Sequence, residues 1–199
     1  MKKGTLSWII VIAVIALLGL WMMSGYNKMV VEQENVETAW GQVEASYQHR
    51  ADLVPSLAQT VEAAVKGEKA EYTAVMEARA KATQVVIDPS NMTEEQLQNF
   101  QKTQGELTQA LNKLMVVAEA YPQLTASQQF IGLRAQLEGV ANRITVSRKT
   151  FNECAQSYNT LIRRFPNNIV ASIFNFTKRP YFAAEEGAEK APELNFNFD

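Results

Sequence analysis

The feature that most constrains this chain is an uncharged apolar run of eighteen residues, Leu6 to Met23. Ten of them are Leu, Ile or Val, and each favours the membrane centre by about 0.3–0.6 kcal/mol. As a helix the run would be about 27 Å long, close to a hydrocarbon core of about 30 Å. Trp8 and Trp21 lie near its ends, where indole rings favour the headgroup zone. The run predicts a membrane anchor over residues 6–23, after a short basic segment at 1–5.

A cleaved secretory signal is the alternative to a retained anchor, because such signals also join basic residues to an apolar core. The exit of the run, from Leu20 to Tyr26, carries bulky residues where a cleavage site needs small ones. The run is also longer than the core of about 7–15 residues that signals carry. No cysteine follows it directly, which excludes lipoprotein processing. We therefore expect a single-pass anchor that is retained.

The flanking charges decide the orientation by a narrow margin. Lys2 and Lys3 precede the run, whereas Lys28 is the only basic residue soon after it. This bias favours a cytoplasmic amino terminus and a periplasmic domain.

Charge divides the rest of the chain into a neutral body and an acidic end. Residues 24–182 hold sixteen basic and sixteen acidic side chains, whereas residues 183–199 hold five acidic ones against Lys190. Few apolar residues and a negative charge predict a disordered acidic tail at 183–199. The body is long enough for one domain, expected at residues 26–182. No nucleic-acid partner is expected of it.

From residue 26 onward apolar residues recur at alternating spacings of three and four, the period of packed helices. Helices are predicted over 26–66, 68–86, 93–121 and about 126–165. Pro55 should kink or divide the first near Asp52, and Thr93 should cap the third. The expected fold is all-α: a transmembrane helix followed by an elongated antiparallel four-helix bundle with long coiled-coil-like helices. The clearest stripe, on the fourth helix, is Phe130, Leu133, Leu137, Val140, Ile144, Ser147, Phe151, Cys154, Tyr158, Leu161 and Phe165.

The residues that usually carry chemistry are scarce. His49 is the only histidine and Cys154 the only cysteine, which makes a zinc site or a Ser-His-Asp arrangement unexpected. The chain has neither a Gly-rich phosphate loop nor the Glu-x-x-His repeats of di-metal bundles. Cys154 lies on an apolar stripe, where we expect a buried small side chain and no reactive thiol. The sequence predicts no catalytic residue, cofactor, metal or small-molecule substrate.

An aromatic segment at 167–182 follows the last predicted helix, and basic pairs flank it. If that helix runs antiparallel to the first, it returns to the membrane, and the segment follows there. We predict that the segment contacts the bilayer surface or a neighbouring subunit. The alternative is a cap that closes the end of the bundle. The candidate contact residues are Arg163, Arg164, Phe174, Phe176, Lys178 and Arg179.

Other polar residues fall on or beside the inward stripes of the predicted helices. We predict that they are hydrogen-bonded core residues that fix the helix register; contacts between subunits are the alternative. Asparagine also recurs directly after an aromatic residue, at Asn27, Asn152 and Asn159. The candidate register residues are Arg50, Arg79, Asn142, Arg148 and Asn159.

The chain carries a series of ordered landmarks between about Tyr26 and Phe182. They are Tyr26-Asn27, Val36, Ala39-Trp40, Arg50-x-Asp52-Leu53-Val54-Pro55-x-Leu57, Ala78-Arg79-Ala80, Glu119-x-Tyr121-Pro122-x-Leu124, Phe130-x-x-Leu133, Leu137-Glu138-x-x-x-Asn142-Arg143-Ile144, Ser147-Arg148, Tyr158-Asn159, Phe165-Pro166-x-Asn168, Phe176 and Tyr181-Phe182. Together these landmarks resemble the LemA family. The resemblance implies a bacterial inner-membrane protein with a helical bundle domain and without an established catalytic residue or cofactor. A magnetosome-associated relative implies a link to membrane organisation, and family assignments often place the domain inside the cell, against the charge bias.

These observations favour a protein that acts through its surfaces. The first hypothesis is a membrane-anchored, non-enzymatic scaffold that self-associates into a homo-oligomer and organises or remodels the lipid bilayer. The alternative is a monomeric adaptor that binds another membrane protein, such as a peptidase.

Overall fold

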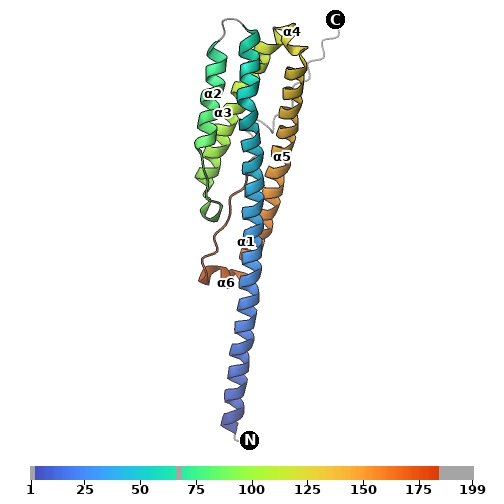
Figure 1. Ribbon diagram of the computed structural model, residues 1–199. Helices are drawn as coiled ribbons and strands as arrows, with labels where there is room; N and C mark the ends of the chain where they lie inside the picture. The colour runs from blue at the N-terminus through green and yellow to red at the C-terminus, as the bar shows by residue number, and fades with distance from the viewer. Residues whose placement is uncertain (1–2, 66–68, 184–199) are drawn as a thin grey trace, which may run out of the picture.

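The computed structural model describes residues 3–65 and 69–183, and within these ranges its regular elements are all helices and it has no strand. Consecutive long helices run antiparallel (Figure 1), which confirms the predicted fold class. Gly67, expected to end the first helix, lies outside the described residues, as does the predicted tail from 184 onward. The elements are α1 (Lys3–Ala64), α2 (Lys69–Gln84), the 3-10 turn η1 (Pro89–Asn91), α3 (Glu94–Glu119), α4 (Pro122–Thr125), α5 (Gln128–Arg163) and α6 (Asn167–Ile173).

Helix α1 is one continuous element of 62 residues, about 90 Å long. Its amino-terminal part extends alone below the bundle (Figure 1) and is long and apolar enough to cross a membrane. Trp8 and Met23 are exposed there, and Trp21 is half-buried. The side chain of Leu6 lies outside the described part of the chain. The same helix therefore forms the candidate membrane span and the first helix of the bundle.

The helix α1 continues through Pro55, so the predicted division near Asp52 is wrong. A proline inside a helix leaves the carbonyl four residues earlier without its backbone donor. Here that carbonyl belongs to Ala51, and it accepts a hydrogen bond of 2.7 Å from Nε of Arg79 on α2. A side chain thus replaces the missing backbone donor and ties α2 to α1 at this point.

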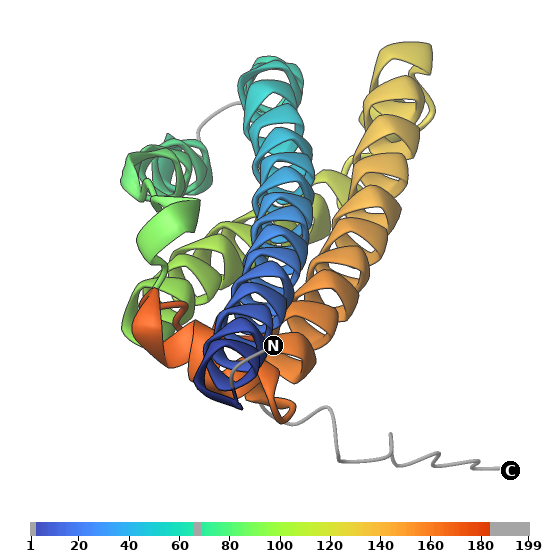
Figure 2. The same cartoon turned by 90° about the horizontal axis from the view of Figure 1, so that it is seen from below.

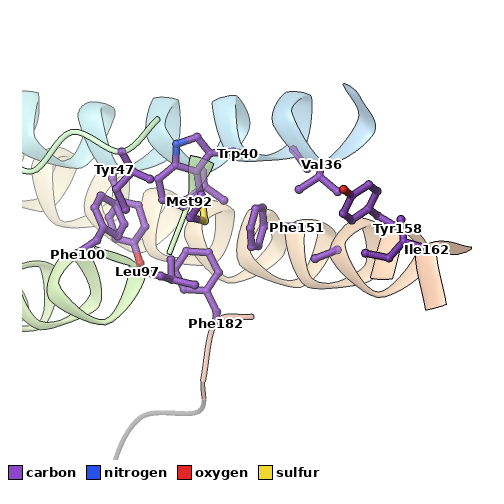
Figure 3. Packing of buried hydrophobic residues seen from close by; sticks show 14 of the residues in the cluster. Val36, Trp40, Tyr47, Met92, Leu97, Phe100, Phe151, Tyr158, Ile162 and Phe182 are labelled. Atoms are coloured by element: carbon purple, nitrogen blue, oxygen red, sulfur yellow. The ribbon is translucent and has the colours of Figure 1, made fainter. Parts of the chain in front are cut away.

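The buried residues form two clusters, one above the other along α1. The distal cluster lies between α1, α2, α3 and the start of α5, and it is mostly aliphatic. The proximal cluster, nearer the membrane span, is built on the rings of Trp40, Phe100, Phe151, Tyr158 and Phe182 (Figure 3). The main buried residues of the distal cluster are Val54, Leu57, Ala58, Val61, Val75, Leu107, Leu114, Ala118 and Phe130.

The predicted helix starts agree with the structure more closely than the predicted helix ends do. Thr93 caps α3 in a capping box with Gln96, and Ser127 caps α5 by accepting from the amide of Phe130. Helix α2 ends at Gln84, two residues before the predicted end at 86, and Val86 is 82% exposed. The chain is extended beyond α2, so it buries the neighbouring Ile87 instead.

The predicted stripe of α5 also drifts toward its carboxyl end. Ala155 and Ile162 are buried there, whereas Cys154 and Leu161 are only half-buried. A helix with 3.6 residues per turn falls behind a strict heptad by about 20° per repeat, which moves the buried face by one position. Phe165 is 76% exposed because α5 has already ended at Arg163.

Candidate membrane-proximal surface

Helix α6 packs across the base of the bundle, at the level where α1 leaves the candidate membrane span (Figures 1 and 2). Val170 and Ala171 are its buried residues. Gly25 of α1 is buried beneath it, and a Cβ at that position would lie 3.6 Å from Cγ2 of Val170 and from Oδ1 of Asn167. These are ordinary van der Waals distances, so the side chains of α6 pack directly against α1 at this position.

The outer side of this region is apolar and exposed. The ring of Phe174 lies 4.8 Å from that of Tyr26 on α1, and the ring of Phe176 lies 5.6 Å from it, centroid to centroid. Phe176 is half-buried, whereas Phe174 is 48% exposed. The exposed large apolar and basic residues of this region, which we call the foot, are Arg163, Arg164, Phe165, Ile169, Ile173, Phe174 and Lys178.

Residues 176–183 form an extended segment that returns from α6 along the bundle; we call it the strap. Two asparagines of α5 hold its backbone. Asn159 accepts from the amide of Arg179 at 2.8 Å and donates to the carbonyl of the same residue at 2.8 Å. Asn152 makes the same pair of bonds with Phe182, at 2.8 and 3.1 Å. Seven helical residues and three extended ones both span about 10 Å, so the two clamps are in register.

Arg179 is buried in the structure, although the sequence predicted it at the surface. It was predicted to contact the membrane or a neighbouring subunit, but its side chain is 3% exposed, which contradicts that prediction. Its guanidinium lies 5.7 Å from the ring centroid of Tyr158, and Nη2 lies 3.9 Å from Oε1 of Glu37 on α1. Burial raises the pKa of the Tyr158 hydroxyl, and the nearby Arg179 charge opposes that rise.

Phe182 carries the end of the strap into the proximal cluster (Figure 3). Its ring stacks at 6.0 Å on that of Trp40 and meets the ring of Phe151 edge-on at 5.4 Å. The guanidinium of Arg148 lies 5.0 Å from the Phe182 centroid, and its Nη2 donates to the carbonyl of Ala183. The strap therefore closes the core as well as joining α6 to α5.

A groove follows the exposed side of α1 across the end of the candidate span. The groove contains a stripe of four α1 residues at spacings of four, three and four, the period of a packed helix: Leu20, Ser24, Asn27 and Val31. All four are exposed, with Leu20 at 61% and Val31 at 59%. The lining residues are Leu20, Met23, Ser24, Asn27, Lys28, Val31, Glu32 and Leu161.

Comparison with known proteins shows the family to which this chain belongs. The model described as the LemA family matches residues 39–196. The chain belongs to the LemA family. This confirms the resemblance drawn from the sequence, although the match begins later than Tyr26 and ends after Phe182. The chain is a membrane-anchored helical protein of that family.

The curated relatives of this LemA-family chain include magnetosome proteins. Magnetosome protein MamQ 2 of Paramagnetospirillum magneticum is 32% identical over 78 residues, which are 39% of this chain and 29% of the relative. Magnetosome protein MamQ of Magnetospirillum gryphiswaldense is 31% identical over 78 residues, with the same two shares. The chain thus spans less than a third of the length of these relatives, and the likeness concerns one segment of each.

The predicted register residues of this LemA-family bundle do not all lie in the core. Arg50 joins α1 to α3: it donates to the side chain of Thr108 at 2.8 Å and to Oε1 of Gln104 at 2.6 Å. Gln104 in turn donates to the carbonyl of Ala82 on α2. Arg79, Arg148 and Asn159 make the contacts described above. Asn142 is exposed on α5, which corrects its assignment to the core.

Two further polar residues were not among the predicted sites. Asn152 shares with Asn159 a place directly after an aromatic residue and a face of α5, seven positions apart. That spacing was a usable signal, but it acquires meaning only with a partner that lies extended beside the helix. Gln104 gave no signal, because a glutamine in the middle of a helix is usually exposed.

The described residues contain no group of three or more His, Cys, Asp or Glu that could hold a metal ion. His49 is exposed, and Cys154 is half-buried on α5. Burial raises the pKa of the Cys154 thiol, and the charges of Glu32 and Glu153 add to that rise. A raised pKa disfavours the thiolate, which is the reactive form. This LemA-family domain presents surfaces and grooves as its distinctive features.

Proposed function

We propose that this LemA-family protein is a non-enzymatic scaffold of the bacterial inner membrane that self-associates into a homo-oligomer and organises or remodels the bilayer. The observation that carries the proposal is the groove along α1, because its helical stripe crosses the end of the membrane span without a break. The homo-oligomer forms through this stripe, which packs against the same stripe on a second copy of the chain.

The stripe suits contact between parallel copies. It continues into the span with the same spacing, through Leu17, Ala13 and Ile10. Copies anchored in one membrane in the same orientation hold identical residues at identical heights, so the stripe of one copy meets that of the next. Asn27 then faces its counterpart, and a polar residue in an apolar seam fixes the register of such pairs.

Further support comes from what the chain resembles. The relatives named above are magnetosome proteins, and the family match brings no catalytic role with it. The exposed apolar residues of the foot add a second surface at the same height, which favours action at the membrane over chemistry in a pocket.

Cross-linking in native membranes tests the interface. In a Cys154→Ala background, Asn27→Cys should form a disulfide-linked dimer under mild oxidation. Val146→Cys is the matched control, because Val146 is 64% exposed but lies on α5, away from the groove. A dimer band from the control alone, or from neither variant, would contradict the proposed interface.

The mass of the intact protein tests the assembly itself. Purified in mild detergent at micromolar concentration, the full chain should have a mass that is a multiple of 22.3 kDa. Val31→Arg should shift the population toward single chains because it places a charge in an apolar seam, whereas Val146→Arg should not. A single-chain mass for the wild type would overturn the scaffold proposal and favour the monomeric adaptor.

The side of the membrane on which the helical domain lies requires a separate measurement. The Lys2 and Lys3 bias predicts a periplasmic domain, whereas family assignments favour the cytoplasm. A reporter that functions only outside the cytoplasm, fused after Asp199, decides between them. The scaffold proposal holds for either side.

A further inference from the structure

We propose that the foot is a binding surface for the lipid bilayer, with its apolar residues in the headgroup–acyl boundary and its basic residues on anionic headgroups. The proposal does not depend on self-association, since one anchored chain is enough to place the foot on a membrane. Three features of the structure support it: the height of α6, the pairing of apolar with basic residues, and the rigid attachment of α6 to the bundle.

The height of α6 follows from its contact with α1. Gly25, against which Val170 packs, lies two residues beyond Met23, which is about 3 Å along the helix axis. Helix α6 runs across α1 (Figure 1), and a helix with its side chains is about 10 Å wide. Its lower edge therefore reaches about 5 Å below its axis, to the end of the membrane span. An interfacial helix places its apolar face at this level, the boundary between headgroups and acyl chains.

The composition of the foot matches this position. Phe165, Ile169, Ile173 and Phe174 are between 47% and 76% exposed in the described structure, although they are large and apolar. Arg163 and Arg164 precede them and Lys178 follows, all three exposed. Apolar side chains bounded by basic ones are typical of surfaces that rest on anionic bilayers.

The attachment of α6 is rigid on both sides. Arg164 follows α5 directly, and the strap is fixed to α5 by the clamps of Asn159 and Asn152. Tyr26 also packs on Phe174, so the foot cannot turn away from the exit of α1 without losing ring contacts. A fixed, off-axis apolar wedge beside the anchor would occupy one leaflet only. This gives the scaffold a direct means of bending the membrane.

The depth of a fluorescent probe tests the proposal in the full chain. In a Cys154→Ala background, Ile173→Cys is labelled with the polarity-sensitive dye NBD, and the protein is placed in nanodiscs of phosphatidylcholine with or without phosphatidylglycerol. Val146→Cys is the control, of similar exposure but about 25 Å farther along α5. We expect a blue-shifted emission at 173 that lipids spin-labelled near the headgroup quench, and neither effect at 146.

The basic residues are tested in the same system. The blue shift at position 173 should be larger with phosphatidylglycerol than without it. The variant Arg163→Gln, Arg164→Gln, Lys178→Gln should lose that difference while it keeps its helical circular dichroism. All three residues are exposed, so the fold does not depend on their charges.

Three results would overturn the proposal. The first is emission at 173 that equals emission at 146 in both lipids. The second is a blue shift that lipid-borne quenchers leave unchanged and that disappears when the oligomer is dissociated, because that result makes the foot a contact between subunits. The third is a lipid preference that the triple variant retains, which would remove the role of the basic residues.

Discussion

Both halves of the bundle have a buried core, but the two cores are closed by different kinds of segment. The distal half closes by helix against helix over aliphatic residues such as Leu57, Leu107 and Leu114. The proximal half closes with a segment that is not helical, and its core is a set of rings around Trp40. The half nearer the membrane thus depends on a few specific side-chain contacts, whereas the distal half depends on a repeated pattern.

The difference has a physical reason. A helix satisfies its own backbone groups, so the distal half needs mainly apolar faces that fit. An extended strap brings unpaired amides and carbonyls to the core, and each needs a partner. Asn152 and Asn159 supply those partners, and Phe182 supplies the apolar anchor. What this arrangement gains is a fixed position for α6 beside the membrane span.

The largest expected effect comes from removing the ring at the centre of the proximal half. Trp40→Ala should lower the free energy of unfolding by about 3–5 kcal/mol, because it leaves a cavity among three other rings. Leu57→Ala, in the distal half, should cost about 2–5 kcal/mol. Hydrogen exchange separates the two: only Trp40→Ala should raise exchange at the amide of Phe182. Equal exchange there in both variants would show that the halves are one cooperative unit.

The loss of a clamp should cost about as much as the loss of the ring that it positions, because two buried groups lose their partners. Asn159→Ala leaves the buried amide and carbonyl of Arg179 without partners, at about 1–3 kcal/mol for each group. Asn142→Ala is the control on the same helix; because Asn142 is exposed, its effect should stay within about 0.5 kcal/mol. Denaturant unfolding of the full chain in detergent measures both. Equal losses would mean that the Asn159 clamp contributes nothing to stability.

A double-mutant cycle can isolate one specific polar contact of the distal half, that of Arg79 with the carbonyl of Ala51. Arg79→Met leaves the Ala51 carbonyl unpaired, at about 1–3 kcal/mol. In a Pro55→Ala background the new amide at position 55 can donate to that carbonyl, so the same change should cost less. We expect a coupling energy of about 0.5–3 kcal/mol from unfolding of the four proteins. Additive effects would show that Arg79 does not replace the missing donor.

These contacts also show where the sequence was and was not informative. The stripe spacing predicted the helices and their antiparallel packing because it records a repeated physical requirement, one apolar face per helix. It predicted a kink or a division near Asp52, and the helix is not divided because Arg79, which lies 24 residues from Pro55 in the sequence, is brought to it by the fold. A pattern confined to one helix carries no information about such a partner.

The candidate surface was predictable in part for the same reason. Phe174 and Lys178 belong to an aromatic and basic segment whose position follows from helix lengths alone. Arg179 looked the same in sequence, but its backbone is clamped by Asn159 and its side chain faces Glu37. Along the strap the exposed Lys178 stands directly beside the buried Arg179. Only the extended conformation, which the helical pattern did not suggest, separates the two.

The smallest expected effect concerns the ionisation of Tyr158 in the proximal half. Its hydroxyl is buried, and it has no hydrogen-bond partner among the described residues, so Tyr158→Phe should leave stability at neutral pH unchanged or slightly higher. Because burial raises the folded-state pKa above the ordinary value of 10.0, the neutral hydroxyl favours folding below pH 10. That contribution is lost as the pH rises from 10 toward the folded-state pKa.

Phenylalanine cannot ionise, so the variant should become increasingly more stable than the wild type above pH 10. Thermal unfolding followed by circular dichroism between pH 8 and about pH 11 measures the difference between the two curves. The distal cluster lies apart from this hydroxyl, so exchange of its amides should show the divergence last. Curves that stay parallel across this range would mean that the strap half opens and solvates Tyr158 before the hydroxyl titrates.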